Sequence, residues 1–535
     1  MKFPKFLELS EDNLKSSAIS FALAITLTYL IVAERQFPIN DGGFWYSFAS
    51  QLTANGFRLP KSIVFNGADF QLTYPPLGAY LIAGFHRLFG FSILQALLIL
   101  PAFFYLINNL LFARFANTLL GNSMWAKATI ISYPLLAYSF RWFLMGGGVP
   151  RGLGLAFQIL AWTACIKSME SDSINKRNVL TIALFTALAI LSHPMAALWT
   201  VIGVSTFMFA KVNLKHLIGI FICAGIMCSP WLILMVYHHG LTPYLNTFSA
   251  TQTSVIQLFQ IPIYLSYSQL SVGMAFIGLF LVMCTPFWRL SCLWLFGLVI
   301  DPRGAALHNG VVPVAFFVGK CASEMIEKLK LQRKGAVLAV LFALTSLSNE
   351  LITTTQLISS KDSFMTVLGE QEVADIYTFK GRVPEGSKTF VMNQHSVAGD
   401  SLGEWLTALT GIEVVNIHQM AEWKGTFYDI LTYQAQHIST CCKGALDKCE
   451  KIISDNENFL FIVHKKSCPL FESKYTATGA ALMSMTRSHW HYWNVIRYSE
   501  LFIRSKKHRG VGQLKSRLLN PQPDITRQLL VLFIK

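Results

Sequence analysis

The feature that most constrains this chain is a series of apolar blocks separated by short basic connections. The first block, residues 16–33, has no charged residue and is just long enough to cross a bilayer as a helix. Hydrophobic residues make up 53% and charged residues 14% of the chain, which excludes an ordinary soluble domain. We predict a mainly α-helical polytopic membrane protein with about eleven spans. The candidate spans are residues 16–33, 92–112, 125–142, 152–167, 178–192, 194–210, 214–236, 271–287, 291–301, 310–322 and 335–352.

The positions of lysine and arginine predict how these spans are oriented. With the amino terminus inside, basic connections alternate with less basic ones, as the positive-inside rule requires. This arrangement puts the block 75–90 in the outer interface; a full span there is the alternative, and it would invert every later connection. The basic residues on the inner side are Arg114, Lys127, Lys167, Lys176, Arg177, Lys211, Lys215, Arg289, Lys328, Lys330, Arg333 and Lys334. The outer segments are residues 34–91, 143–151, the turn at His193-Pro194, 237–270, 302–309 and all those after 352.

The apolar blocks stop after Ile352, which marks a second domain. The pattern of apolar residues predicts buried strands at residues 388–392 and 459–463, with helical patterns around them. We therefore predict an extracytoplasmic α/β domain over residues 353–535. It follows a transmembrane domain of residues 1–352. From about residue 486 the chain is basic and aromatic, a composition typical of a tail that lies on an anionic membrane or is disordered. The net charge of +15 comes without any nucleic-acid-binding motif, so we expect no nucleic-acid partner.

Cysteine spacing gives a prediction about disulfides and none about metals. Four cysteines, Cys441, Cys442, Cys449 and Cys468, cluster in the polar second domain. No CxxC pair or His/Cys spacing indicates a zinc site. If this domain lies in an oxidising compartment, Cys441 or Cys442 is expected to pair with Cys449 or Cys468.

The predicted topology gathers ionisable residues on the outer side of the membrane. Such residues suggest a functional site, because charge at membrane depth is unfavourable. The set includes Asp41, Arg58, Asp69, Arg141, Arg151, His193, Asp301, Arg303 and His308. Each also has a structural alternative. Asn40 or Asp41 could cap the helix that follows, Arg151 could be an interfacial residue, Asp301 could pair with Arg303, and His193 before Pro194 could start a helix.

Several motifs in this set resemble the GT-C superfamily of membrane glycosyltransferases. These are an acid after the first span followed by YPPL, GGGVPRGLGLAF, the Ser192-His193-Pro194 turn, DPRGAALHNGVVP, and GDSLGEWLTALTG. The resemblance implies a polyprenyl-phosphate-linked sugar donor and a glycan, glycolipid or protein acceptor. It implies an active site on the extracytoplasmic face that includes Asp41, with Tyr74-Pro75-Pro76 at the end of the first loop. The first loop lacks Asp-x-Asp, which weakens the case for a metal like that of oligosaccharyltransferases; we assign no cofactor, and a divalent metal stays possible.

The chemistry of sugar transfer assigns roles to these residues. A base must accept the proton of the acceptor hydroxyl, and we assign this role to Asp41, with Asp69 as the second acid. Cations must hold the departing phosphate, and we assign Arg303 and Arg151 first, with Arg58, His193 and His308 beside them. We assign Tyr74, Asp400, Glu404 and Trp405 to the acceptor side; the last three could instead belong to an ordinary turn before the helix LGEWLTALTG. We expect an inverting enzyme in a bacterial or archaeal plasma membrane.

A transporter or flippase of lipid-linked saccharides is the alternative function. Transporters typically place charges and broken helices at the bilayer midplane, in two related halves. This sequence has no repeated halves, and its charges gather at one face. A structural assembly subunit would leave that one-sided charge unexplained.

Overall fold

The computed structural model divides into two compact units, which we describe separately. The first contains residues 1–61 and 72–357, and the second contains residues 62–71 and 358–535. The structure describes residues 11–33, 35–65, 68–71, 73–170, 174–209, 214–250, 269–301, 309–328, 348, 351–356, 358, 367–380, 388–392, 401–417, 419–421, 426–443, 460–464, 482–483, 485–486, 489–490 and 531–534.

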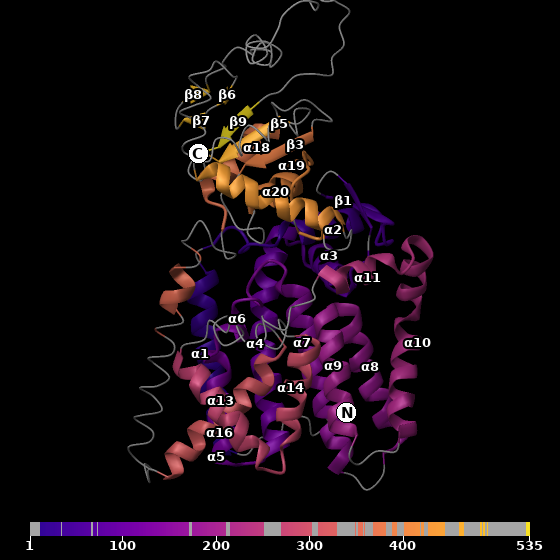
Figure 1. Cartoon of the computed structure of the whole chain (residues 1–535), viewed down its shortest axis with the longest axis vertical. Helices are drawn as coiled ribbons and strands as arrows, with labels where there is room; N and C mark the ends of the chain where they lie inside the picture. Colours follow the sequence, from indigo (N-terminus) through magenta and orange to yellow (C-terminus); the bar gives the residue numbers. More distant parts are fainter. Residues whose placement is uncertain are drawn as a thin grey trace, which may run out of the picture. The chain divides into compact units, whose positions relative to one another are not determined.

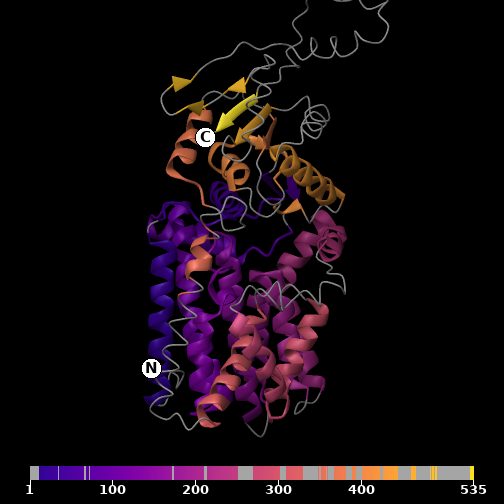
Figure 2. The same ribbon diagram turned by 60° about the vertical axis from the view of Figure 1, so that its left-hand side comes forward.

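The first unit is a bundle of helices (Figures 1 and 2). Its elements are α1 (Glu11–Val32), α2 (Gly43–Ala54), α3 (Leu77–Phe89), α4 (Ile93–Leu120), α5 (Met124–Ser132), η1 (Tyr133–Leu135), α6 (Ala137–Phe140), α7 (Gly148–Glu170), α8 (Lys176–Ser192), α9 (Pro194–Met208), α10 (Leu214–His239), α11 (Thr242–Ala250), α13 (Gln269–Met283), α14 (Arg289–Ile300) and α16 (Val311–Lys328). Among the described residues, four helices are long and apolar enough to cross a membrane: α1, α4, α7 and α10. This confirms a mainly helical membrane protein.

One predicted span is wrong in detail, and others remain untested. Residues 125–142 form α5, η1 and α6 instead of one helix. The break comes at Tyr133-Pro134, because proline has no backbone N–H and its ring clashes with the preceding turn. Most of the candidate span 335–352 lies outside the described residues. Helix α3 has 13 residues and is roughly 20 Å long, so it is too short to cross the hydrocarbon core.

Helix α7 is the element that positions the candidate site. It packs against α4, α8 and α9, and small residues allow the close approach. A Cβ added to Gly152 would lie 2.7 Å from Cβ of Phe104, and one added to Gly154 would lie 2.7 Å from Cβ of Ala196. The side-chain amide of Asn108 donates to the Gly152 carbonyl at 2.9 Å. These contacts fix the first turn of α7, where Arg151 lies.

The second unit contains a parallel sheet. Its five strands run in the order β4 (Glu413–Val414), β3 (Lys388–Met392), β5 (Leu460–His464), β9 (Val531–Ile534) and β6 (Leu482–Met483), each parallel to its neighbours. Two antiparallel hairpins, β1 (Ser62–Phe65) with β2 (Ala68–Gln71) and β7 (Met485–Thr486) with β8 (His489–Trp490), also belong to it. Its helices are α18 (Glu370–Lys380), α19 (Ser401–Thr410) and α20 (Thr426–Cys442).

One short part of the predicted surface-bound or disordered tail is a strand, and most of residues 486–535 lie outside the described residues. The apolar run Val531–Ile534 forms strand β9, which pairs with β5 on one side and β6 on the other. This run is wholly apolar, and valine, isoleucine and phenylalanine are common in strands.

Candidate functional site

The loop before α2 and the loop before α7 are tied together by backbone bonds. Ile39 and Met145 form a parallel bridge, and the Gly146 amide donates to the Ile39 carbonyl at 2.9 Å. Asn40 then takes a left-handed conformation with φ 49°, which asparagine tolerates better than most residues. The chain therefore turns sharply between Ile39 and Gly42 and presents the Asp41 side chain to the second loop.

The Asp41 carboxylate is held at both oxygens. Its Oδ1 accepts the backbone N–H of Gly147 at 2.9 Å, and its Oδ2 accepts Nη2 of Arg151 in an ion pair. The side chains of Asp41 and Arg151 are 8% and 15% exposed, so water screens this pair only in part. Gly42 is the N-cap of α2, and the Asp41 carboxylate bonds Gly147 and Arg151 instead, so the helix-capping alternative for Asp41 is wrong.

Two further contacts hold the guanidinium of Arg151. Its Nη1 donates to the Trp142 carbonyl at 3.1 Å, and Cζ lies 5.2 Å from the centre of the Trp142 ring. A guanidinium suits such a site because it can donate in several directions within its plane while one face stacks on an aromatic ring. Arg151 is therefore fixed beside Asp41, which argues against the alternative of a loose interfacial side chain.

The three glycines before Arg151 had no predicted role of their own. In the structure they let the two loops approach more closely than side chains would allow. A Cβ added to Gly146 would lie 2.6 Å from Cα of Gly42, and one added to Gly147 would lie 2.5 Å from Oδ2 of Asp41. Gly148 is equally crowded by the Phe143 carbonyl. The run of three consecutive glycines was the available signal, because such a run allows backbone and side chains to approach unusually closely.

His193 and Tyr74 lie near this pair. The Nδ1 atom of His193 accepts the backbone N–H of Met195 at 3.2 Å, so His193 is the N-cap of α9, as its structural alternative predicted. Burial, together with the charge of Arg151, lowers the pKa of His193 to about 3. The ring is therefore neutral at physiological pH, and this hydrogen bond places its proton on Nε2.

Aromatic side chains of α2 surround the half-buried Tyr74. Its ring packs edge-on against His193, with centroids 6.1 Å apart, and against Trp45, with centroids 5.0 Å apart. The ring centroid of Phe44 lies 6.4 Å from that of Tyr74. Tyr74 therefore belongs to the same part of the first unit as His193, whose ring feels the charge of Arg151.

Other predicted site residues are placed less completely. Asp301 is the C-cap residue of α14, and its Oδ2 accepts a hydrogen bond from Nε1 of Trp199 at 3.0 Å. Arg303 and His308 lie outside the described residues. Arg58 is exposed just after α2. Asp69 lies on β2, opposite Val64, and belongs to the second unit.

The residues predicted for the acceptor side include two that are buried in the second unit. Trp405 is fully buried and Glu404 is 2% exposed, both on α19. The side-chain amide of Gln419, in the orientation that satisfies both groups, donates to the two Glu404 oxygens at 2.8 Å. This burial gives both residues a packing role, and their acceptor role stays a prediction. Asp400 lies outside the described residues.

The neighbours of Asp41 do not fit a metal ion. A metal ligand must offer lone pairs, yet the groups that contact this carboxylate are an amide N–H and a guanidinium, both donors. Within the part of the chain that the structure describes, no group of three His, Cys, Asp or Glu residues is arranged to hold a metal. Arg151 supplies the positive charge at this position.

Comparison with solved structures identifies the fold. The archaeal oligosaccharyltransferase AglB from Archaeoglobus fulgidus, in complex with an inhibitory peptide and a dolichol-phosphate, matches 79% of this chain and 68% of its own, with a TM-score of 0.54 and 10% identity. The apo oligosaccharyltransferase of that organism matches 82% of this chain and 72% of its own, with a TM-score of 0.53 and 10% identity. ArnT from Cupriavidus metallidurans bound to undecaprenyl phosphate matches 88% of this chain and 82% of its own, with a TM-score of 0.49 and 11% identity.

No family model matches the chain, and no curated protein matches its sequence. The likeness to solved structures therefore stands on the fold. It confirms the predicted resemblance to GT-C membrane glycosyltransferases at that level.

Proposed function

We propose that this chain is a membrane glycosyltransferase that moves a sugar from a polyprenyl-phosphate-linked donor to a hydroxyl or similar group of an acceptor. The observation that carries the proposal is the Asp41–Arg151 pair, which lies where α7 begins in a fold shared with an oligosaccharyltransferase. That relative was solved with a dolichol-phosphate, a ligand of the donor class proposed here. The pair offers a carboxylate for the acceptor and a guanidinium for the phosphate.

The proposed reaction is a single displacement. As the acceptor oxygen forms a bond to the anomeric carbon, the bond from that carbon to the phosphate oxygen breaks. The acceptor proton passes to the Asp41 carboxylate, and the lipid phosphate leaves with the bonding electron pair. Arg151 stabilises the growing negative charge on the phosphate, with Arg303, Arg58 and His308 as further predicted donors and neutral His193 as a hydrogen-bond donor. Attack opposite the leaving group inverts the anomeric centre.

Donor binding is proposed to free Asp41. Without donor, Arg151 and Gly147 hold both oxygens of the carboxylate, which limits its contact with an acceptor hydroxyl. The phosphodiester of the donor is an anion with paired oxygens, like the carboxylate, and it competes for the same guanidinium. The donor therefore both occupies Arg151 and releases the base, so that Asp41 is activated when a sugar is present to be transferred.

The finer topology belongs to this proposal. We place about eleven spans in the membrane, with the Asp41–Arg151 pair and the second domain on the extracytoplasmic side. Single cysteines introduced at Lys176 and at Lys388, in a variant lacking native exposed cysteines, test this orientation. An impermeant thiol reagent applied to intact cells should label position 388 and leave position 176 unlabelled. Labelling of both from one side would contradict the orientation.

The function itself is tested by reconstitution. The full chain in liposomes is given a polyprenyl-phosphate donor with a radiolabelled sugar, together with extracted envelope lipids, glycans and proteins. Transfer of the label from donor to one of these fractions, dependent on Asp41, supports the enzyme. The alternative, a transporter or flippase, predicts instead that the donor crosses the bilayer with its sugar still attached.

A further inference from the structure

A second site lies at the other end of the first unit. A cavity of about 240 Å³ is bounded by the ends of α4, α7 and α9 and by the segment that leads into α14. Helix α7 links the two sites: Arg151 lies in its first turn and Glu170 is its last residue, roughly 28 Å further along the axis. That length is close to the thickness of the hydrocarbon core. The cavity therefore lies at the depth of the lipid headgroups on the side of the membrane opposite Asp41.

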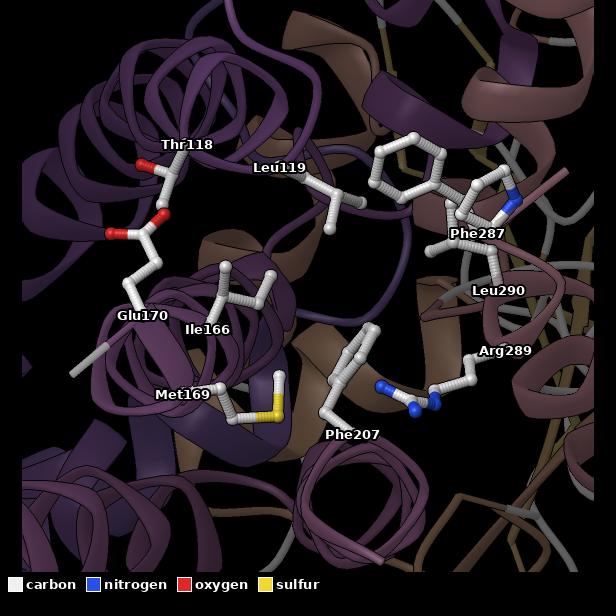
Figure 3. A pocket seen from close by; sticks show the side chains of 10 residues that line it. Thr118, Leu119, Ile166, Met169, Glu170, Phe207, Phe287, Arg289 and Leu290 are labelled. Atoms are coloured by element: carbon white, nitrogen blue, oxygen red, sulfur yellow. The ribbon is translucent and has the colours of Figure 1, made fainter. Parts of the chain in front are cut away.

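The lining of this cavity is apolar in the middle and charged at two sides. It comprises Thr118, Leu119, Ile166, Met169, Glu170, Phe207, Pro286, Phe287, Arg289 and Leu290. Figure 3 shows Glu170 and Thr118 together on one side and Arg289 on another, with Ile166, Met169 and Phe207 between them. The cavity thus offers an anion and a cation separated by an apolar wall.

We propose that this cavity binds the headgroup of a phosphatidylethanolamine molecule. The phosphate accepts hydrogen bonds from the Arg289 guanidinium, and the ammonium group donates to the Glu170 carboxylate and the Thr118 hydroxyl. The acyl chains follow the apolar flanks of the neighbouring helices. Structural lipid binding of this kind is separate from sugar transfer and uses none of the residues assigned to it.

The charge arrangement decides which lipid fits. An anionic headgroup such as phosphatidylglycerol satisfies Arg289 but leaves Glu170 facing a group without a positive charge. Phosphatidylcholine has both charges, but its quaternary ammonium is bulkier and has no N–H to donate. Lys167 also interacts electrostatically with Glu170, but it does not line the cavity. Glu170 therefore supplies the negative charge that faces the ligand.

Native mass spectrometry of the delipidated full chain tests this proposal. The protein in detergent is titrated with phosphatidylethanolamine, phosphatidylglycerol and phosphatidylcholine of identical acyl chains. We expect phosphatidylethanolamine to bind about fivefold more tightly than the other two. Arg289→Gln should weaken its binding by at least about fivefold, and Glu170→Gln should abolish the preference over phosphatidylglycerol.

Two matched variants serve as controls. Arg177→Gln and Glu327→Gln remove exposed charges from the same end of the unit, at the start of α8 and the end of α16, and neither residue lines the cavity. Both should bind as wild type does. If Arg289→Gln or Glu170→Gln proves unstable, Arg289→Lys and Thr118→Val test the same contacts with smaller changes. Equal wild-type affinity for the three lipids, or an unchanged preference in the cavity variants, would overturn the proposal.

Discussion

Asp41 and Arg151 are 110 residues apart in the sequence, yet their side chains form an ion pair that is largely shielded from water. The pair joins the loop after α1 to the first turn of α7. Each partner also has a backbone contact, Asp41 with the N–H of Gly147 and Arg151 with the carbonyl of Trp142. This double attachment fixes both groups in one orientation, which is what a reaction centre needs.

Gly147→Ala should displace the Asp41 carboxylate. The added Cβ would lie 2.5 Å from Oδ2 and 2.8 Å from Cγ of Asp41, distances that force the side chain to move. We expect sugar transfer to fall on the order of a hundredfold, since small misplacements of catalytic groups have effects of this size. Gly84→Ala on α3 is the control, because a Cβ there meets nothing within 4 Å. Equal transfer rates in the two variants would remove Gly147 from the site.

Arg151→Lys should weaken donor binding while retaining the positive charge. One ammonium cannot reproduce the guanidinium that bonds Asp41 and Trp142 and stacks on the Trp142 ring. We expect the dissociation constant for a short-chain polyprenyl phosphate to rise at least about tenfold. Arg177→Lys, at the other end of the unit, is the control. The same measurement on Arg303→Ala tests the second predicted phosphate ligand, and normal affinity there would refute that assignment.

His193 should make stability depend on pH without affecting the pH dependence of the reaction. Its pKa is about 3 in the folded chain and close to 6.5 when unfolded, so below pH 6.5 the unfolded state binds a proton that the folded state does not. Stability therefore falls as the pH falls, by about 2 kcal/mol between pH 6.5 and 5. His193→Asn keeps a side chain that can cap α9 and removes the titrating group. Thermal unfolding midpoints at pH 7 and pH 5 should differ less in this variant, and an equal difference would contradict the assignment.

The cysteines of the second unit give a test of its compartment. Cys441 and Cys442 are both disulfide-bonded, which confirms that cysteines of this cluster pair; their predicted partners Cys449 and Cys468 lie outside the described residues. Alkylation of the purified, non-reduced chain followed by peptide mapping should leave Cys441 and Cys442 unmodified. The exposed free thiol of Cys284 is the internal control and should be modified. Modification of all three without reductant would contradict an oxidising environment.

The sequence indicated Asp41 and Arg151 as candidate residues but did not predict the contact between them. Asp41 and Arg151 were identified because ionisable residues next to membrane spans are rare and usually functional. Their pairing was not predicted, because it depends on a bridge between Ile39 and Met145 that no local pattern encodes. The capping alternative for Asp41 failed for a related reason. The left-handed conformation of Asn40, with φ 49°, turns the chain there, and Gly42 is the N-cap of α2 in place of Asp41.

Two errors in the fold had signals in the sequence. Pro134 lies inside the predicted span 125–142, and a proline in the middle of a helix usually breaks or kinks it. In the sequence, Asn66-Gly67 stands between β1 and β2, and this dipeptide favours hairpins, although no strand was predicted there. The hairpin's membership of the second unit, by contrast, depends on contacts with residues after 357 and could not be read from the local sequence.

The central claim is that Asp41 is the catalytic base, and Asp41→Asn tests it most directly. The variant can still accept the N–H of Gly147 through its amide oxygen, but it loses the ion pair with Arg151 and cannot take up the acceptor proton. Two quantities are measured on the reconstituted chain, the turnover of sugar transfer and the affinity for polyprenyl phosphate, with Glu327→Gln as the control carboxylate. We predict that turnover falls on the order of a hundredfold or more while the phosphate binds at least as tightly as in wild type, because Arg151 is released. Near-normal turnover in Asp41→Asn would contradict the account and leave Asp69 as the next acid to test.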